Sequence, residues 1–131
     1  MKFAVFAIVL ISFAALVLTQ SRRNTIKWGY KKQSDVLIGR YNVIEKAKSS
    51  WFSSEAVNLT LQYPAKGRLG RNISAIYFFE APKGRANPKL LSGGIGRNYT
   101  TILLTSQKGQ GLNVTVELYG PQQQQQRWNR G

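Results

Sequence analysis

Residues 112–118, LNVTVEL, and residues 56–63, AVNLTLQY, place an apolar side chain at every second position and a polar one between. A period of two is typical of a β-strand with one face in the core and one face in water. The run 73–80, ISAIYFFE, is apolar on both faces, as expected of a strand in the interior of a sheet. These three stretches predict a protein built on β-sheet.

Three further runs extend this pattern outward along the chain. Residues 99–105 are rich in β-branched and aromatic types, and residues 35–44 hold an apolar run interrupted by Gly39. Residues 25–30 read as a short edge strand. Strands at intervals of roughly 10–20 residues predict an all-β fold, a small single-domain sandwich or barrel of about six strands.

The segments between these runs are rich in Gly, Pro and charge. We expect turns at 64–71, 82–98 and 107–111. The glycines of GGIG, 93–96, are expected to serve a turn or a bulge, because a phosphate-binding loop would need a helix after it. The stretch 43–56 is compatible with a helix, although its four serines weaken that prediction.

Composition limits the chemistry that this chain can perform. The 131 residues include 19 Lys and Arg against 5 Asp and Glu, a formal net charge of +14, and neither His nor Cys. The lack of His excludes nucleophile systems with an imidazole base, and no thiolate or imidazole zinc site and no disulfide can form. We therefore predict a protein that is not an enzyme, with no catalytic residues, no metal ligands and no cofactor.

The remaining enzymatic alternative is a hydrolase that uses either two carboxylates or a Ser/Lys pair. The first of these mechanisms would need two of the acidic residues. They stand isolated along the chain, and no spacing pairs them. We expect each of them to be a surface partner for the abundant Lys and Arg. They are Asp35, Glu45, Glu55, Glu80 and Glu117.

The first residues form a secretory signal pattern. Lys2 precedes an apolar run at 3–18, which is followed by polar residues. The alternatives are an uncleaved membrane anchor and a buried helix, but the run is shorter than the roughly 20 residues that span a bilayer. We expect a signal helix that meets the membrane only transiently and is cleaved near Thr19 or Ser21.

We expect three parts along the chain, of which cleavage removes the first. Residues 1–21 are the signal peptide, residues 22–120 are the β domain, and the Gln-rich tail 121–131 is expected to be disordered. A domain of this size without cysteines is held together by apolar burial.

Four Asn-x-Ser/Thr sequons occur, at Asn58, Asn72, Asn98 and Asn113. Chance would give about one in a chain of this composition. All four asparagines fall on the polar face of an expected strand or just after a turn, so each could carry an outward glycan. The alternative is that Asn and Thr are simply good polar partners on half-buried strands.

The segment 22–32, RRNTIKWGYKK, holds five basic residues and no acidic one. Aromatic rings among cations are typical of a surface that stacks on and neutralises a polyanion. The alternative is a solvating role that keeps an edge strand from pairing. No motif specific for nucleic acid accompanies the charge. The candidate polyanion-binding residues are Arg22, Arg23, Lys27, Trp28, Lys31 and Lys32.

Several blocks of the sequence resemble an insect family. They are WG at 28–29, GR at 39–40, ISAI at 73–76, GGIG at 93–96, TTI at 100–102, SQKGQGLN at 106–113 and VELYG at 116–120. The family is the transcription activator family multiprotein bridging factor two, whose members are also labelled probable salivary secreted peptides. The resemblance covers residues 28–120. It implies a small non-enzymatic protein, and its nominal role is a co-activator that bridges a sequence-specific factor and the basal transcription machinery.

The leading hypothesis is a small, basic, N-glycosylated protein that is secreted and acts outside the cell by binding. Its partner would be an unknown extracellular protein or a polyanion. One alternative is a transcriptional co-activator that works by protein–protein contact. Another is an extracellular protein that binds polyanions or membrane surfaces.

Overall fold

The computed structural model describes residues 24–49 and 54–122. Within them the chain forms nine β-strands: β1 (Asn24–Gly29), β2 (Asp35–Glu45), β3 (Lys48–Ser49), β4 (Ser54–Glu55), β5 (Asn58–Tyr63), β6 (Ala75–Glu80), β7 (Lys89–Gly93), β8 (Thr100–Thr105) and β9 (Leu112–Pro121). The expected signal peptide with its cleavage positions, Arg22, Arg23 and most of the expected tail lie outside the described residues. In the part of the chain that is described, no helix has the length and apolar character needed to cross a membrane.

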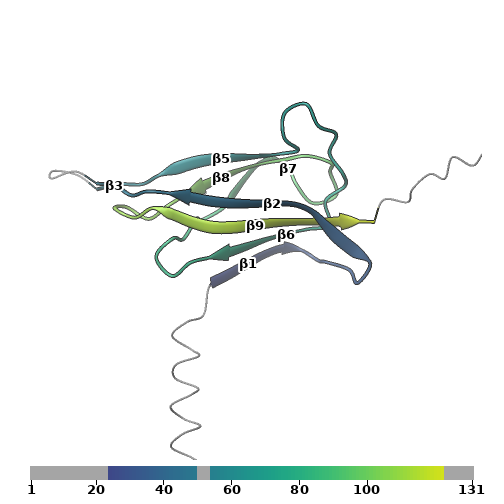
Figure 1. Ribbon diagram of the computed structural model, residues 1–131, viewed down its shortest axis with the longest axis horizontal. Coiled ribbons are helices and arrows are strands. Elements are labelled where there is room, and N and C mark those ends of the chain that lie inside the picture. The colour runs from purple at the N-terminus through teal and green to yellow at the C-terminus, as the bar shows by residue number, and fades with distance from the viewer. Residues whose placement is uncertain (1–23, 50–53, 123–131) are drawn as a thin grey trace, which may run out of the picture.

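The strands form two antiparallel sheets that face each other, which confirms the predicted all-β sandwich (Figure 1). One sheet has the strand order β1-β6-β9-β2, and the other has the order β5-β8-β7. The short strands β3 and β4 pair with each other at one end. As predicted, β6 is an interior strand and β1 lies at an edge.

The apolar side chains of the alternating strands form the core between the two sheets. Val114, Val116 and Leu118 of β9 are buried, and they meet buried residues such as Leu61 of β5 and Ile102 of β8 in one apolar cluster. Burial of this apolar surface is the main driving force for folding. The sandwich therefore holds together by packing, as expected for a chain without disulfides.

Two sequence predictions about local structure are wrong. Residues 89–93, expected in a turn, form β7, an exposed edge strand whose register shifts between Leu90 and Ser92. An edge strand with a bulge need not alternate, so the apolar pattern gave no sign of it. The stretch 43–56 is not a helix in its described part: β2 continues to Glu45, and β3 and β4 follow.

The expectation that the acidic residues lie at the surface is also wrong for three of them. Asp35, Glu80 and Glu117 are buried. A buried carboxylate requires hydrogen-bond donors, and each of the three has them. Asp35 Oδ2 accepts from the backbone N–H of Lys32 at 2.8 Å. Within the described residues, Glu117 alone forms an ion pair, with Arg40.

Candidate functional site

Two of the candidate polyanion-binding residues, Trp28 and Lys27, lie on opposite faces of β1. Trp28 is half-buried and packs edge-on against Phe78 in the core, with ring centroids 4.8 Å apart. Lys27 is exposed on the opposite face of β1, where its Nζ lies 5.2 Å from the ring centroid of Tyr77. Neighbouring residues of a strand point to opposite faces, so the Trp28 ring and the Lys27 ammonium do not share one surface.

The outer face of the four-stranded sheet carries a row of interacting side chains. Strand register aligns Lys27 with Tyr77, Tyr77 with Glu117, and Glu117 with Arg40. Arg40 donates to Glu117 Oε2 from Nη2 at 2.6 Å and from Nε at 2.9 Å. The Tyr119 hydroxyl donates to the other carboxylate oxygen of Glu117. Across this face the row therefore runs from a cation to an aromatic ring, then to a carboxylate and to a second cation.

The electrostatics of the row follow from these contacts. Burial alone would raise the pKa of Glu117, but hydrogen bonds from Tyr119 and Arg40 and the charges of Arg40 and Lys31 outweigh it, and the pKa lies below its ordinary value. Burial and the hydrogen bond to Glu117 raise the pKa of Tyr119 to about 12. Lys31 Nζ lies 4.5 Å from the centroid of the Tyr119 ring.

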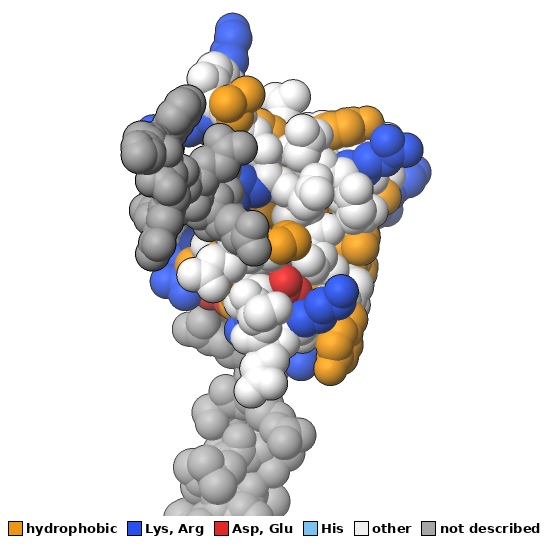
Figure 2. Space-filling model, turned by 90° about the vertical axis from the view of Figure 1, so that its right-hand side faces the viewer, with side chains coloured by type: hydrophobic (Ala, Val, Ile, Leu, Met, Phe, Trp, Pro, Cys, Tyr) orange, Lys and Arg blue, Asp and Glu red, His pale blue; other side chains and the backbone are white. Residues whose placement is uncertain are grey.

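A second group of cations gathers at the end of the sandwich where the loop 64–74 joins β5 to β6. Figure 2 looks onto this end, with Lys and Arg around its rim and apolar side chains between them. Arg68 and Arg71 come from the loop itself, and Arg40 comes from β2. The loop is held in place because the backbone N–H of Arg71 donates to the Tyr63 hydroxyl at 2.9 Å.

Close packing also fixes this loop against the neighbouring loop 94–99. A Cβ on Gly70 would lie 1.8 Å from the carbonyl oxygen of Asn98, so only glycine allows the approach. The backbone N–H of Ile73 donates to the carbonyl of Arg97 at 2.8 Å. The turn interpretation of the glycine run 93–96 agrees with the positive φ angles of Gly93, Gly94 and Gly96.

Three arginines meet in a cavity of about 350 Å³ between β2 and this loop. We call it the arginine cavity. Its lining consists of Ile38, Gly39, Arg40, Tyr41, Tyr63, Pro64, Ala65, Arg68, Leu69 and Arg71. No acidic residue belongs to this lining. Burial, and then the proximity of Tyr63, raise the pKa of Tyr41, so its phenol stays neutral and can donate a hydrogen bond.

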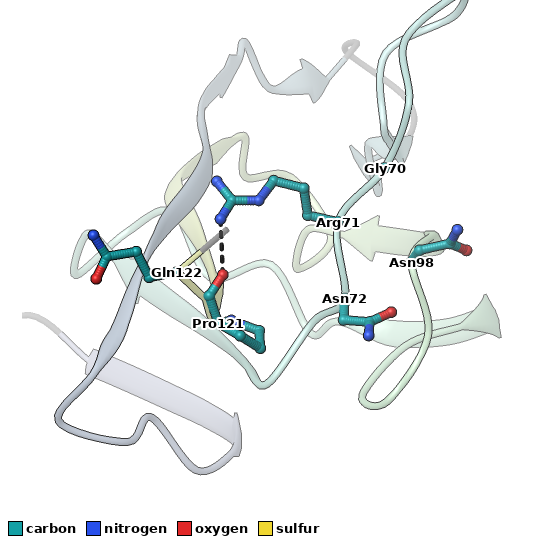
Figure 3. Close-up of a pocket in the computed structure, with 6 residues that line it drawn as sticks. All are labelled: Gly70, Arg71, Asn72, Asn98, Pro121 and Gln122. Atoms are coloured by element: carbon teal, nitrogen blue, oxygen red, sulfur yellow. Dashed lines mark hydrogen bonds between the residues drawn. The ribbon is translucent and has the colours of Figure 1, made fainter. Parts of the chain in front are cut away.

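A second cavity, of about 300 Å³, shares Arg71 with the first. Figure 3 shows the residues around it. It is lined by Gly70, Arg71, Asn72, Asn98, Pro121 and Gln122. Arg71 extends towards the end of β9, where its Nη2 donates to the Pro121 carbonyl at 2.7 Å, and the amides of Asn72 and Asn98 point to the other side. Arg71 therefore lines both cavities and links the loop to β9.

All four sequon asparagines are exposed in the structure. Asn58 and Asn113 lie on strands β5 and β9, and Asn58 Oδ1 accepts a hydrogen bond from the Thr105 hydroxyl at 2.8 Å. Asn72 and Asn98 precede β6 and β8 and share the second cavity. Glycans on these four residues remain a prediction.

The charged turn expected at 64–71 contains Arg68 and Arg71, but the sequence did not single them out as binding residues, and it gave no sign of Arg40, Tyr41 or Tyr63. The basic loop 64–71 was the one available signal. The cavity itself depends on the pairing of β2 with β9 and on the return of the loop over β2, which no local pattern encodes.

The arrangement suits the binding of an anion. Guanidinium groups form paired hydrogen bonds with carboxylates and similar oxyanions. In residues 24–49 and 54–122, no group of three or more His, Cys, Asp or Glu side chains could hold a metal ion.

The family described as Transcription activator MBF2 matches the chain over residues 28–120. The chain belongs to this family. The match runs from β1 to β9 and so includes strands of both sheets. A comparison with curated proteins finds no match, and neither does a comparison with solved structures.

Membership in the MBF2 family confirms the resemblance at the level of the family. The description "Transcription activator" supports the co-activator alternative more than the leading hypothesis of a secreted protein, about which the match says nothing. Insect origin and a salivary role stay predictions.

Proposed function

We propose that this protein activates transcription by contact with another protein and without catalysis. The observation that carries this proposal is the match to the MBF2 family, which extends over nearly the whole sandwich. Such a match concerns the domain as a unit and not one short motif. The role therefore belongs to the surface that the folded sandwich presents.

Two features of the surface support contact with a protein. The sandwich exposes large apolar side chains, among them Leu69 with 98% of its area accessible, next to arginines. Arginine and aromatic residues beside apolar ones are typical of protein interfaces. The formal charge of +14 favours partners that carry acidic residues.

The test is a reporter assay in cells. The full chain and residues 22–131 are each joined to a DNA-binding domain, and expression from a promoter with its target site is measured. We expect the version without the leader to raise expression above the DNA-binding domain alone. No increase, with the fusion detected in the nucleus, would contradict the proposal.

A second candidate function is that of a secreted glycoprotein. It is favoured by the leader pattern at residues 1–21 together with the exposure of all four sequon asparagines. A glycan needs an outward Asn, and the described strands and loops provide four.

Expression of the full chain in eukaryotic cells tests this second role. We expect the protein in the medium, with a gel mobility that increases after treatment with a glycan-removing enzyme. Replacement of each sequon asparagine by Gln should remove one step of the shift. Asn42→Gln, at an exposed asparagine outside any sequon, should remove none. Unglycosylated protein retained in the cell would contradict this role.

A further inference from the structure

The cations of the arginine cavity are largely without acidic partners. Within residues 24–49 and 54–122, the one ion pair is that of Arg40 with Glu117. Arg71 donates one hydrogen bond, from Nη2 to the Pro121 carbonyl. A guanidinium has five N–H donors, so both arginines retain donors, and Arg68 adds an exposed guanidinium beside them.

Apolar and aromatic residues form the rest of the lining of the same cavity. They include Tyr41 and Tyr63 together with Ile38 and Leu69. Leu69 is almost fully exposed, so a ligand that covers it gains free energy by removing its apolar surface from water. The cavity thus combines charged donors with apolar residues, of which Leu69 is uncovered.

We propose that the arginine cavity binds an acidic segment of a partner protein, in which carboxylates meet Arg68 and Arg71 and an adjacent apolar side chain packs on Leu69 and Tyr41. This inference rests on the proposed function, since it assigns the chemistry of the protein partner. Arginine clusters are a recurring means of recognising acidic motifs.

The cavity is already shaped before binding. The Arg71 N–H bond to the Tyr63 hydroxyl and the turn closed by Arg68 N–H on the Ala65 carbonyl, at 3.0 Å, hold both arginines on a fixed loop. A site held in its binding conformation loses less entropy when a ligand binds. A sulfated polysaccharide would instead need a row of cations and would leave Leu69 uncovered.

The direct test measures the anisotropy of a fluorescent peptide with glutamates around a leucine, titrated with the purified full chain. The double variant Arg68→Gln/Arg71→Gln should weaken binding by about tenfold or more. The matched control, Lys83→Gln/Arg85→Gln, removes the same charge from the loop between β6 and β7 at the opposite end, and should change binding by no more than about twofold. A peptide with Gln in place of Glu should not bind.

Two further variants guard against a simple folding defect, since Arg71 also bonds to Pro121. Arg68→Gln alone changes one exposed residue and should weaken binding by about threefold or more. Leu69→Ser leaves the charge unchanged, and it should weaken binding because it removes the apolar contact. Circular dichroism of each variant should match that of the unaltered protein.

Three results would overturn the inference: no binding of the acidic peptide, equal weakening by both double variants, or arginine-dependent binding of heparin in place of the peptide. The reporter assay separates this inference from the proposed function. If Arg68→Gln/Arg71→Gln still activates, the inference fails and the function stands. If peptide binding depends on the arginines but no version of the chain activates, the inference stands and the function fails.

Discussion

Glu80 shows how a single acidic residue can serve as a structural link. Its side chain is 1% exposed and has two donors, Asn24 Nδ2 at 2.7 Å and the backbone N–H of Ala86 at 2.6 Å. The first donor belongs to the edge strand β1 and the second to the loop before β7. The carboxylate therefore ties both segments to β6, and a buried donor left without its acceptor is costly.

Replacement of Glu80 by Ala should lower the free energy of unfolding by about 2 kcal/mol or more, because the buried backbone N–H of Ala86 loses its acceptor and the hydrogen bond from Asn24 is lost as well. Urea denaturation measures the loss. Glu45→Gln, at an exposed position of β2, serves as the control and should change stability little. Equal stability of Glu80→Ala and the unaltered protein would show that these hydrogen bonds contribute nothing.

The Tyr119 hydroxyl should ionise at a higher pH than an ordinary tyrosine, in a separate step of the alkaline titration. Absorbance at alkaline pH should show a tyrosine step at a pKa of about 12 that is lost in Tyr119→Phe. The folded state holds the neutral phenol, so this contribution to stability is complete below the ordinary pKa of 10.0 and is lost as the pH rises towards 12. An unchanged titration curve in Tyr119→Phe would contradict this assignment.

At the scale of strands and loops, the sequence is informative wherever one face of a strand is buried and the other is wet. Alternation at 56–63 and 112–118 identified β5 and β9, since every second side chain enters the core. It failed for β7, which has both faces exposed, and at 43–56, where β2 ends and β3 and β4 follow.

The candidate site was far less predictable than the strands. Arg40 and Arg71 are 31 positions apart in the sequence, and they share a cavity only because the 64–74 loop lies against β2. Local patterns carry no information on such long-range placement. Charge density alone pointed to the N-terminal segment, where the structure directs Trp28 into the core.

The loop that presents the arginines depends on Gly70. Gly70→Ala should cost about 3 kcal/mol and weaken peptide binding, because the added Cβ would collide with the carbonyl of Asn98. Gly67→Asn is a control in the same loop: its φ is +84°, which asparagine tolerates, and no atom lies within 4 Å of the added Cβ. Thermal unfolding compares the two variants, and equal losses would refute the role of the close contact.

At the scale of the whole molecule, acid should destabilise the fold. Protonation of the five acidic residues leaves 19 cationic side chains without anionic partners. The pKa of Glu117 is lowered in the folded state, so its contribution is present above the ordinary value of 4.5 and is lost as the pH falls through the lower folded value. Unfolding followed against pH should show this decline, with a smaller slope in Glu117→Gln.

Added salt provides a second measurement of the same effect. Salt screens the repulsion between exposed cations, so it should recover part of the stability lost at low pH. Glu55→Gln, at an exposed position, should keep the pH slope of the unaltered protein. Stability that is independent of pH between 5 and 3 would contradict both expectations.

Asn72 follows Arg71 directly in the sequence. Both residues and Asn98 line the same cavity. Oligosaccharide transfer to Asn-x-Ser/Thr takes place on chains of the secretory route. A copy that takes this route and is modified at both asparagines presents sugar beside Arg71, whereas a copy made without entering it presents the bare guanidinium. If both proposed roles hold, they use the same end of the sandwich, and the presence of glycans on Asn72 and Asn98 would decide which kind of partner can reach Arg71.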